Sequence, residues 1–264
     1  MHKSLRFATL TVACAVAGAA LYGTGAATAG QSTANSTHEP HNIGLLVQEI
    51  DSYYGTTADS AGVYQASATS PYAKDLARIE SAAKKDIDKA ARKALHKGKK
   101  PAVVFDIDDT LLLSLDYEKK TNYTYNSATW TEYVAKADRP AVFGTPELVA
   151  YAKAKGVEVF YNSGLKESQR AAAVANLKKV GADINLDAAH MFLKDAANPP
   201  AYLSACATPG TWTCTTVQYK SGTRGHIEDL GYDIIANFGD QYSDLQGGYA
   251  DKTYKLPNPT YFVS

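Results

Sequence analysis

Apolar and polar positions along the chain repeat with two different periods. One charge-rich segment, which begins at Ser70-Pro71, carries apolar residues three and four positions apart. These positions are Leu76, Ile79, Ala83, Ile87 and Ala91. The spacing predicts a long amphipathic helix, and Ser followed by Pro is a favourable start for one. We interpret its charged side as a solvated surface.

Short apolar runs and further helical patterns alternate along the rest of the chain. Runs typical of buried strands lie at 102–107, 157–162, 190–194 and 232–240. Helical patterns lie at 42–55, 127–137, 145–156, 166–181 and 222–231. Strands separated by helices predict an α/β fold, in which a mostly parallel sheet carries helices on both faces.

The first 29 residues have a pattern of their own. Lys3 and Arg6 precede a run of small apolar residues, and Ala27-Thr28-Ala29 offers a cleavage site. This pattern predicts a secretory signal peptide over 1–29, with an N-terminal membrane anchor as the alternative. We therefore expect a secreted protein, extracellular or periplasmic. Residues 30–69 are expected to hold a polar segment and a short helix.

Composition and charge narrow the possible partners. The 264 residues are 45% hydrophobic and 20% charged, which is ordinary for a globular protein. Basic and acidic residues number 27 each, so loss of Lys3 and Arg6 leaves a net charge of −2. This balance argues against a nucleic-acid polymer as partner. No second apolar run reaches membrane-spanning length, so we expect no membrane association after cleavage. The oligomeric state stays open.

Two cysteines lie close together outside the predicted signal peptide. Cys206 and Cys214 flank Pro209-Gly210. In an exported chain this spacing predicts a disulfide that closes a hairpin within residues 200–219. A metal site is the alternative, but no further His or Cys lies nearby at zinc-ligand spacing.

Acidic residues follow two of the predicted strands. Asp106 and Asp108 come after the run Ala-Val-Val-Phe, and Asp240 and Asp244 follow the last strand. In a parallel sheet, ligands bind beyond the carboxyl ends of the strands. Carboxylates gathered there repel one another unless a cation joins them, and hard oxygen ligands suit Mg²⁺. A polar turn is the alternative explanation for the first pair.

Two more residues complete a set that suits phosphoryl transfer. Ser163 follows the strand at 157–162, and Lys220 lies just before the helix expected at 222–231. A hydroxyl, a lysine and a cation can together hold phosphoryl oxygens while a carboxylate receives the phosphorus.

These motifs, in this order, resemble the haloacid dehalogenase-like (HAD) phosphohydrolases. Asp106-Ile-Asp-Asp-Thr110 matches their DxDxT signature, and Ser163, Lys220 and the run GDQYSD stand at their second, third and fourth motifs. The runs YKSGTRGHIEDLGYDIIANFGDQYSDL and KLPNPTYF resemble the branch that includes class B acid phosphatases and plant vegetative storage proteins. The resemblance covers residues 70–264. It implies a Rossmann-like core with a small cap insert at about 113–144.

The resemblance also implies a role for each residue. Asp106 attacks phosphorus and forms an aspartyl-phosphate, and Asp108 protonates the leaving alcohol and then activates water. Ser163 and Lys220 bind the remaining phosphoryl oxygens. Mg²⁺ is held by the carboxylates of Asp106 and Asp240 and by the backbone carbonyl of Asp108. Asp244 either lies behind these ligands or contacts a water bound to the ion.

Two acidic residues have simpler explanations. Asp244 is also placed where an acid at a helix start is favoured by the helix dipole. Asp109 is interpreted as a capping acid and stays outside the catalytic set.

The sequence indicates the type of reaction more clearly than it indicates the leaving group of the substrate. Leu165 stands where many family members carry arginine, which leaves the substrate preference open. In the expected insert, Trp130 and Tyr133 either stack on an aromatic substrate or form the core of the insert. The sequence thus predicts a secreted Mg²⁺-dependent phosphomonoesterase for small phosphomonoesters. The alternatives are a non-catalytic storage or binding protein, which the intact Asp106 disfavours, and a phosphotransferase.

Overall fold

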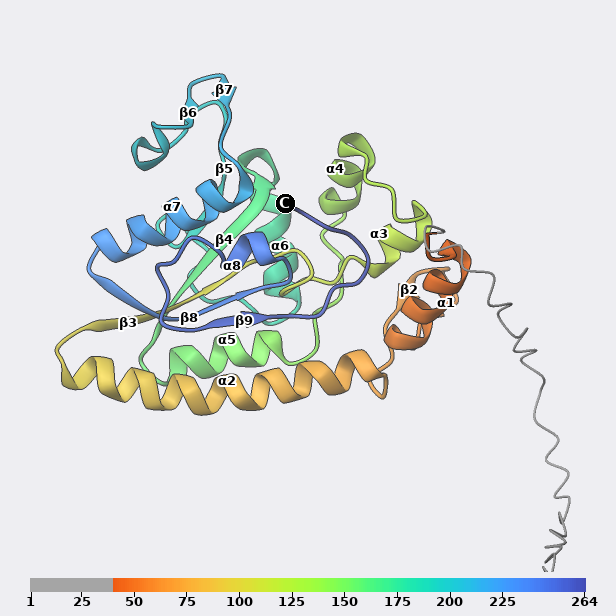
Figure 1. Cartoon of the computed structure of the whole chain (residues 1–264), viewed down its shortest axis with the longest axis horizontal. Helices are drawn as coiled ribbons and strands as arrows, with labels where there is room; N and C mark the ends of the chain where they lie inside the picture. The colour runs from red at the N-terminus through yellow and green to blue at the C-terminus, as the bar shows by residue number, and fades with distance from the viewer. Residues whose placement is uncertain (1–39) are drawn as a thin grey trace, which may run out of the picture. The chain divides into compact units, whose positions relative to one another are not determined.

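The computed structural model describes residues 40–264 (Figure 1). The predicted signal peptide and most of the polar segment after it lie outside the described residues. The helices are α1 (Ile43–Tyr54), α2 (Pro71–His96), α3 (Leu115–Lys120), α4 (Ser127–Ala135), α5 (Thr145–Ala154), η1 (Glu167–Gln169), α6 (Arg170–Lys179), η2 (Ala201–Leu203), α7 (Thr216–Asp229) and α8 (Tyr242–Leu245). The strands are β1 (Thr57–Ala58), β2 (Tyr64–Gln65), β3 (Lys100–Phe105), β4 (Glu158–Lys166), β5 (Met191–Lys194), β6 (Ala207–Thr208), β7 (Thr211–Trp212), β8 (Tyr232–Gly239) and β9 (Thr253–Lys255).

Five parallel strands form the central sheet, in the order β5-β4-β3-β8-β9. β3 lies in the middle, between β4 and β8. Because neighbouring strands run in the same direction, the carboxyl ends of β3, β4 and β8 meet at one edge of the sheet. The predicted α/β architecture with a parallel sheet is confirmed.

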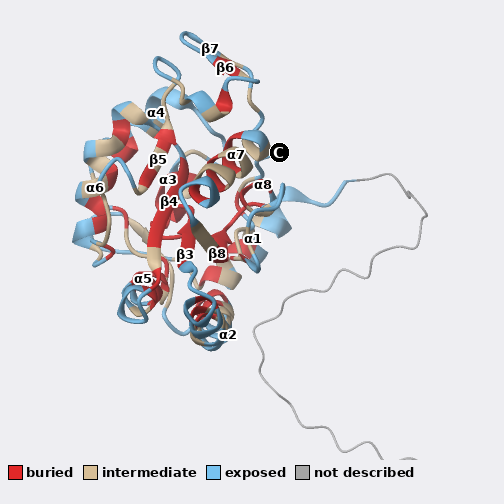
Figure 2. Cartoon of the chain, turned by 90° about the vertical axis from the view of Figure 1, so that its left-hand side faces the viewer, coloured by how far each residue is buried: buried red, intermediate tan, exposed pale blue. Residues whose placement is uncertain are grey.

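Successive residues of β3 face opposite sides of the sheet. Val103 and Phe105 belong to the larger core, which α2 and α5 close from one side. Ala102 and Val104 belong to a smaller core with Ile227 of α7 on the other side. Figure 1 shows α2 and α5 on one side of the sheet and α7 on the other, and Figure 2 shows the strands buried between them. Each large side chain buried in this way contributes roughly 1.5–3 kcal/mol to stability.

The hairpin expected at 200–219 is shorter than predicted, and the helix after it starts earlier. The hairpin consists of β6 and β7, closed by the predicted disulfide between Cys206 and Cys214 with Cα atoms 4.8 Å apart. Helix α7 begins at Thr216, because Thr215 and Gln218 form a reciprocal capping box. Lys220 therefore lies inside a helix rather than before one.

Several short elements have no counterpart among the predicted ones: β1, β2, α3, η2, α8 and β9. Each is six residues or shorter. A segment of that length completes too few repeats for a hydrophobic period to be read.

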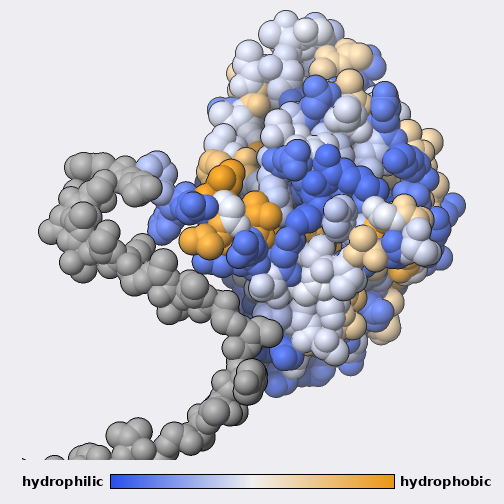
Figure 3. Space-filling model, turned by 90° about the vertical axis from the view of Figure 1, so that its right-hand side faces the viewer, coloured by the Kyte–Doolittle hydropathy of each residue, from blue (hydrophilic) through white to orange (hydrophobic). Residues whose placement is uncertain are grey.

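Helix α1 packs against the start of α2. The rings of Tyr54 and Tyr72 lie 4.5 Å apart in the core. On its outer side α1 exposes Ile43, Leu45 and Leu46, and Figure 3 shows hydrophobic side chains gathered on this face. None of the helices within residues 40–264 has both the length and the apolar character that spanning a membrane requires.

Candidate active site

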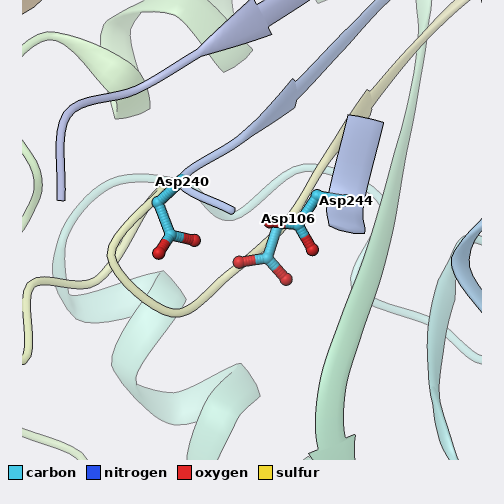
Figure 4. Close-up of side chains that lie close together, drawn as sticks. All are labelled: Asp106, Asp240 and Asp244. Carbon is cyan, nitrogen blue, oxygen red and sulfur yellow. The ribbon is translucent and has the colours of Figure 1, made fainter. Parts of the chain in front are cut away.

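Three buried carboxylates converge at the carboxyl end of the sheet (Figure 4). Asp106 directly follows β3, Asp240 directly follows β8, and Asp244 lies on α8. One oxygen of each lies within 4.8 Å of the other two, and none of the three residues is more than 6% exposed. They meet because β3 and β8 are neighbours in the sheet although distant in the chain.

The close approach of Asp244 depends on Gly239, the last residue of β8. A Cβ atom at residue 239 would overlap the side chain of Asp244. The Asp244 carboxylate also accepts a hydrogen bond from the backbone N–H of Gln241 at 3.0 Å, which caps α8. Asp244 is thus both an acid at a helix start and a member of the carboxylate cluster.

Lys220 joins two members of this cluster from α7. Its Nζ atom donates to Oδ1 of Asp106 at 2.5 Å and to the carbonyl of Asn162 at 2.5 Å, and it lies 2.9 Å from Oδ1 of Asp244. The Asn162 amide in turn donates to the Lys220 carbonyl at 2.9 Å. Burial alone lowers the pKa of Lys220, but the adjacent Asp106 and Asp244 outweigh it, so the net direction is upward. The ammonium is therefore charged.

Asp108 is held by a residue that the sequence reasoning did not select. Nη1 of Arg139 donates to Oδ1 of Asp108 at 2.6 Å. Arg139 is 2% exposed, and its guanidinium lies 5.4 Å from the centre of the Trp130 ring. The segment between β3 and α5 thus contributes the cation that positions the second aspartate.

The side chain of Asp109 stabilises the loop after β3 by hydrogen bonds and is not a member of the carboxylate cluster. Its carboxylate accepts hydrogen bonds from the backbone N–H of Ser114 at 2.8 Å, from the Ser114 hydroxyl and from the Tyr261 hydroxyl at 2.9 Å. Its backbone is left-handed, with φ of 53°. These contacts tie the loop to the segment near the end of the described chain.

The same C-terminal segment also holds Asp240. Nδ2 of Asn258 donates to Oδ2 of Asp240 at 2.8 Å, and Nε2 of Gln241 donates to the same atom at 2.7 Å. Asn258 and Tyr261 both stand in the run KLPNPTYF, which marked the family resemblance without indicating a role for either residue.

A cavity of about 610 Å³ opens over the carboxylate cluster. Its walls include Asp108, three aromatic residues of the segment between β3 and α5, and Trp212 of the disulfide hairpin. The three aromatic residues are Tyr123, Tyr125 and Trp130. Trp130 lines the cavity and also packs on Tyr117 with ring centres 5.0 Å apart, whereas Tyr133 is buried in the interior.

Glu118 is a second residue that the sequence reasoning did not select. It lies on α3, is 5% exposed and lines the cavity. Burial, with a smaller contribution from Asp109, raises the pKa of Glu118 to about 8. No motif marks it, because it sits in a short helix with no recognisable pattern.

Ser163 is fully buried near the end of β4. Its hydroxyl accepts the backbone N–H of Leu165 at 3.1 Å, and its carbonyl accepts the hydroxyl of Tyr219 at 3.0 Å. Gly164, rather than Ser163, is among the residues that line the cavity. Leu165 packs in the larger core, so the position where many relatives carry arginine does not face the cavity here.

The electrostatics of the cluster fit a divalent cation. Burial raises the pKa of Asp106, although Lys220 opposes the shift, and burial together with Asp244 raises the pKa of Asp240 to about 7. Burial is the largest cause of both shifts, and the neighbouring carboxylates add to it, because both disfavour a further negative charge. Three carboxylate oxygens within a few ångströms form a donor set for a hard cation.

Comparison with known proteins gives one family. The model of the HAD superfamily, subfamily IIIB (acid phosphatase), matches residues 26–264. A stem 28 kDa glycoprotein of Glycine max is 34% identical over 62% of this chain and 61% of its own. Vegetative storage protein 1 of Arabidopsis thaliana is 32% identical over 61% of this chain and 54% of its own.

A solved structure agrees with this result. The class C acid phosphatase of Bacillus anthracis superposes with a TM-score of 0.53 and 25% identity, over 70% of this chain and 78% of the other. The chain spans about half to three fifths of the length of the plant relatives that it matches.

Proposed function

The chain belongs to subfamily IIIB of the HAD superfamily, the acid phosphatases, and on this premise we propose that it is a Mg²⁺-dependent phosphomonoesterase. It hydrolyses small phosphomonoesters through an aspartyl-phosphate. The observation that carries the proposal is the convergence of Asp106, Asp240 and Asp244 with Lys220 at the floor of one cavity.

Asp106 is the nucleophile. Its buried carboxylate already contacts Lys220, which offsets the repulsion between an anionic nucleophile and an anionic substrate. Asp108 lines the same cavity and acts first as general acid toward the leaving alcohol, then as general base toward water. Arg139 keeps the Asp108 carboxylate in one orientation through both steps.

The phosphoryl oxygens are bound by Lys220 and by the end of β4. Ser163 has the hydroxyl that the family motif predicts, and Gly164 brings the backbone beside it to the cavity wall. The Ser163 hydroxyl accepts one N–H and, within residues 40–264, donates to no protein group; it lies buried beside the cavity-lining Gly164, from where we assign its hydrogen to a phosphoryl oxygen.

Mg²⁺ would be held by the carboxylates of Asp106 and Asp240, by the Asp108 carbonyl, and by Asp244 directly or through water. When bound, it supplies positive charge that neutralises the phosphoryl oxygens during attack. Asn258 and Gln241 orient the Asp240 carboxylate from behind by donating to one of its oxygens.

We assign residues 70–264 to the phosphatase domain and about 113–144 to its cap. The support is that α3 and α4 of this segment contribute cavity-lining residues while the sheet contributes the carboxylates. We also propose that residues 1–29 direct secretion, which accords with a disulfide between Cys206 and Cys214.

The decisive experiment is an assay of the purified mature chain with p-nitrophenyl phosphate. We expect turnover with Mg²⁺, loss on adding EDTA and recovery on restoring Mg²⁺. Asp106→Asn is nearly isosteric and should reduce kcat by at least about a thousandfold, because no carboxylate remains to attack phosphorus. An unchanged circular dichroism spectrum serves as the control for folding. Full activity of this variant would contradict the proposal, and no turnover by the wild type would favour a storage or binding role.

The same assay separates hydrolysis from phosphotransfer. With glycerol present, a phosphotransferase releases more nitrophenol than inorganic phosphate, whereas a hydrolase releases equal amounts. We expect equal amounts.

A further inference from the structure

The cavity is larger than a phosphoryl group needs, and one wall of it leads from the carboxylate cluster to a lysine that forms no ion pair within residues 40–264. Tyr219, the residue before Lys220 in the chain, also lies on this wall. Its ring centre is 5.5 Å from that of Trp212. The ammonium of Lys194, at the end of β5, lies 4.8 Å from the centre of the Trp212 ring. All four residues line the cavity.

Lys194 has a second lysine directly beside it. Lys166 at the end of β4 is its Cα partner in the sheet. Like charges at paired positions of neighbouring strands repel each other. Burial lowers the pKa of Lys194, and the charge of Lys166 lowers it further.

Within residues 40–264, neither lysine forms an ion pair with a carboxylate. Lys166 donates to the hydroxyl of Ser127 at 3.2 Å, and Lys194 lies on an aromatic ring. The nearest acid in the chain, Asp195, instead accepts the backbone N–H groups of Ala197 and Asn198. Within the described part of the chain, the positive charge of Lys194 at the cavity wall is therefore left without an anionic partner.

We infer that Lys194, supported by the charge of Lys166, binds a second anionic group of the substrate. This inference rests on the proposed phosphatase function and narrows its substrate class. The substrate is a phosphomonoester that carries a further phosphate or carboxylate, and the Trp212 ring packs on the part of the molecule between the two anionic groups. Lys194 is half-buried, lies next to another lysine and forms no ion pair within residues 40–264. It therefore gains a favourable charge-assisted contact when the second anionic group of a substrate reaches it while the phosphoryl group is held at the carboxylate cluster.

The test compares phosphomonoesters that differ by one anionic group. Suitable pairs are phenyl phosphate with para-carboxyphenyl phosphate, and adenosine monophosphate with adenosine bisphosphate, since they separate the two groups by different lengths. For at least one pair we expect the wild type to favour the more anionic member by about tenfold in kcat/KM, mainly through KM. The preference should shrink as salt is added.

Lys194→Met keeps the length of the side chain over Trp212 and removes its charge. We expect the loss in kcat/KM to be about tenfold greater for the more anionic member of the pair than for the other. Lys100→Met is the matched control, because Lys100 also lies over an aromatic ring, that of Tyr232, and does not line the cavity. A wild type with no preference in either pair, or a variant that loses both members equally, would overturn the inference.

A binding measurement separates failure of this inference from failure of the proposed function. In the Asp106→Asn background, calorimetry with adenosine bisphosphate and adenosine monophosphate needs no turnover. If the wild type hydrolyses nothing but the bisphosphate binds more tightly and Lys194→Met removes the difference, the anion site stands and the catalytic proposal fails. Equal binding of the two nucleotides would reject the anion site even in an active enzyme, provided that para-carboxyphenyl phosphate also shows no preference.

Discussion

At the scale of single residues, the ion pair between Arg139 and Asp108 joins the segment between β3 and α5 to the loop that follows β3. The guanidinium is buried and forms one ion pair, at 2.6 Å. Its Nε and Nη2 atoms have no hydrogen-bond partner within the described chain. A buried cation with so few partners is costly to keep, which argues that its position relative to Asp108 matters for function.

Arg139→Met should therefore lower kcat more than it lowers stability. We expect a decrease in kcat of about tenfold to a hundredfold, because Asp108 loses the contact that fixes its orientation. Steady-state kinetics and thermal unfolding measure the two effects. Arg78→Gln, at a highly exposed arginine of α2, is the control and should change neither. Unaltered kcat in Arg139→Met would show that Asp108 needs no orienting partner.

Glu118 gives a prediction about pH and stability. Its pKa is raised by burial to about 8, above that of an exposed glutamate. The neutral form is thus favoured in the fold, and stability is lost as pH rises from the unfolded pKa through the folded one. Glu118→Gln should match the wild type at about pH 4.5 and be more stable by up to about 4 kcal/mol at about pH 8.

Urea unfolding at several pH values measures this difference. Glu132→Gln, at an exposed position of neighbouring α4, provides the comparison and should leave the pH dependence unchanged. A stability difference between Glu118→Gln and the wild type that does not vary with pH would contradict the assignment of a neutral Glu118.

Residues of the site could be predicted only where a motif or a strand end marked them. Asp106, Asp240 and Lys220 follow from an apolar run and a familiar order, and the structure brings them together with Asp244. Glu118 and Arg139 could not be found in this way, because their burial arises from how the segment between β3 and α5 packs against parts of the chain that are distant in the sequence. That packing involves contacts between distant segments, which no local pattern encodes.

At the scale of elements, the disulfide hairpin is a part of the cavity wall with only a small hydrophobic core of its own. β6 and β7 each contain two residues, and their small core consists mainly of Leu203, Ala207 and Tyr219. Two strands of this length are not stable by themselves. The Cys206–Cys214 bond therefore contributes much of the order in this segment, which carries Trp212 into the cavity.

Replacing both Cys206 and Cys214 by Ser should destabilise the protein by about 2–3 kcal/mol, from the chain entropy of a short closed loop. We also expect KM to rise, since Trp212 and Thr215 belong to the cavity wall. Guanidinium unfolding and kinetics are the measurements, and dithiothreitol treatment of the wild type should reproduce both effects. A variant with lower stability but unchanged KM would show that the hairpin is only structural.

Element boundaries depended on capping chemistry more than on hydrophobic period. The predicted start of α2 at Ser70-Pro71 agrees with the structure, where the Ser70 hydroxyl accepts the backbone N–H of Ala73. The helix predicted at 222–231 begins later than α7 does in the structure, because Gly222 does not mark a helix start. The capping box at Thr215 and Gln218 was the signal that would have corrected it.

At the scale of the whole molecule, we expect the carboxylate cluster to make stability depend on both cation and pH. Without a divalent cation, burial and neighbouring acids favour the protonated form of Asp240, whose pKa is raised to about 7. Stability is then lost as pH rises from about 4 through about 7. A bound cation removes that loss, because it stabilises the charged carboxylates.

The gain in melting temperature on adding Mg²⁺ should therefore be greater at about pH 8 than at about pH 5. Differential scanning calorimetry of EDTA-treated and Mg²⁺-loaded protein measures it. Asp240→Asn is the paired variant and should reduce the gain at the higher pH. A gain that is equal at both pH values would mean that the cation does not bind at these carboxylates.

The arrangement of the fold was largely predictable, whereas the cavity was not. Alternating strands and helices imply a parallel sheet covered on both faces, and the structure confirms it. The walls of the cavity come instead from α3, the hairpin at Trp212 and the segment around Tyr261. These parts are irregular or short, so their positions depend on tertiary packing against the sheet.

The two strands that border the sheet are its shortest: β5 has four residues and β9 has three. An open border of a sheet exposes unpaired N–H and C=O groups, to which strands of other chains can add and start aggregates. Here each border offers few such groups, and both strands end in a lysine, Lys194 and Lys255. The native sheet is consequently a poor template for fibrillar growth, even when the protein is concentrated.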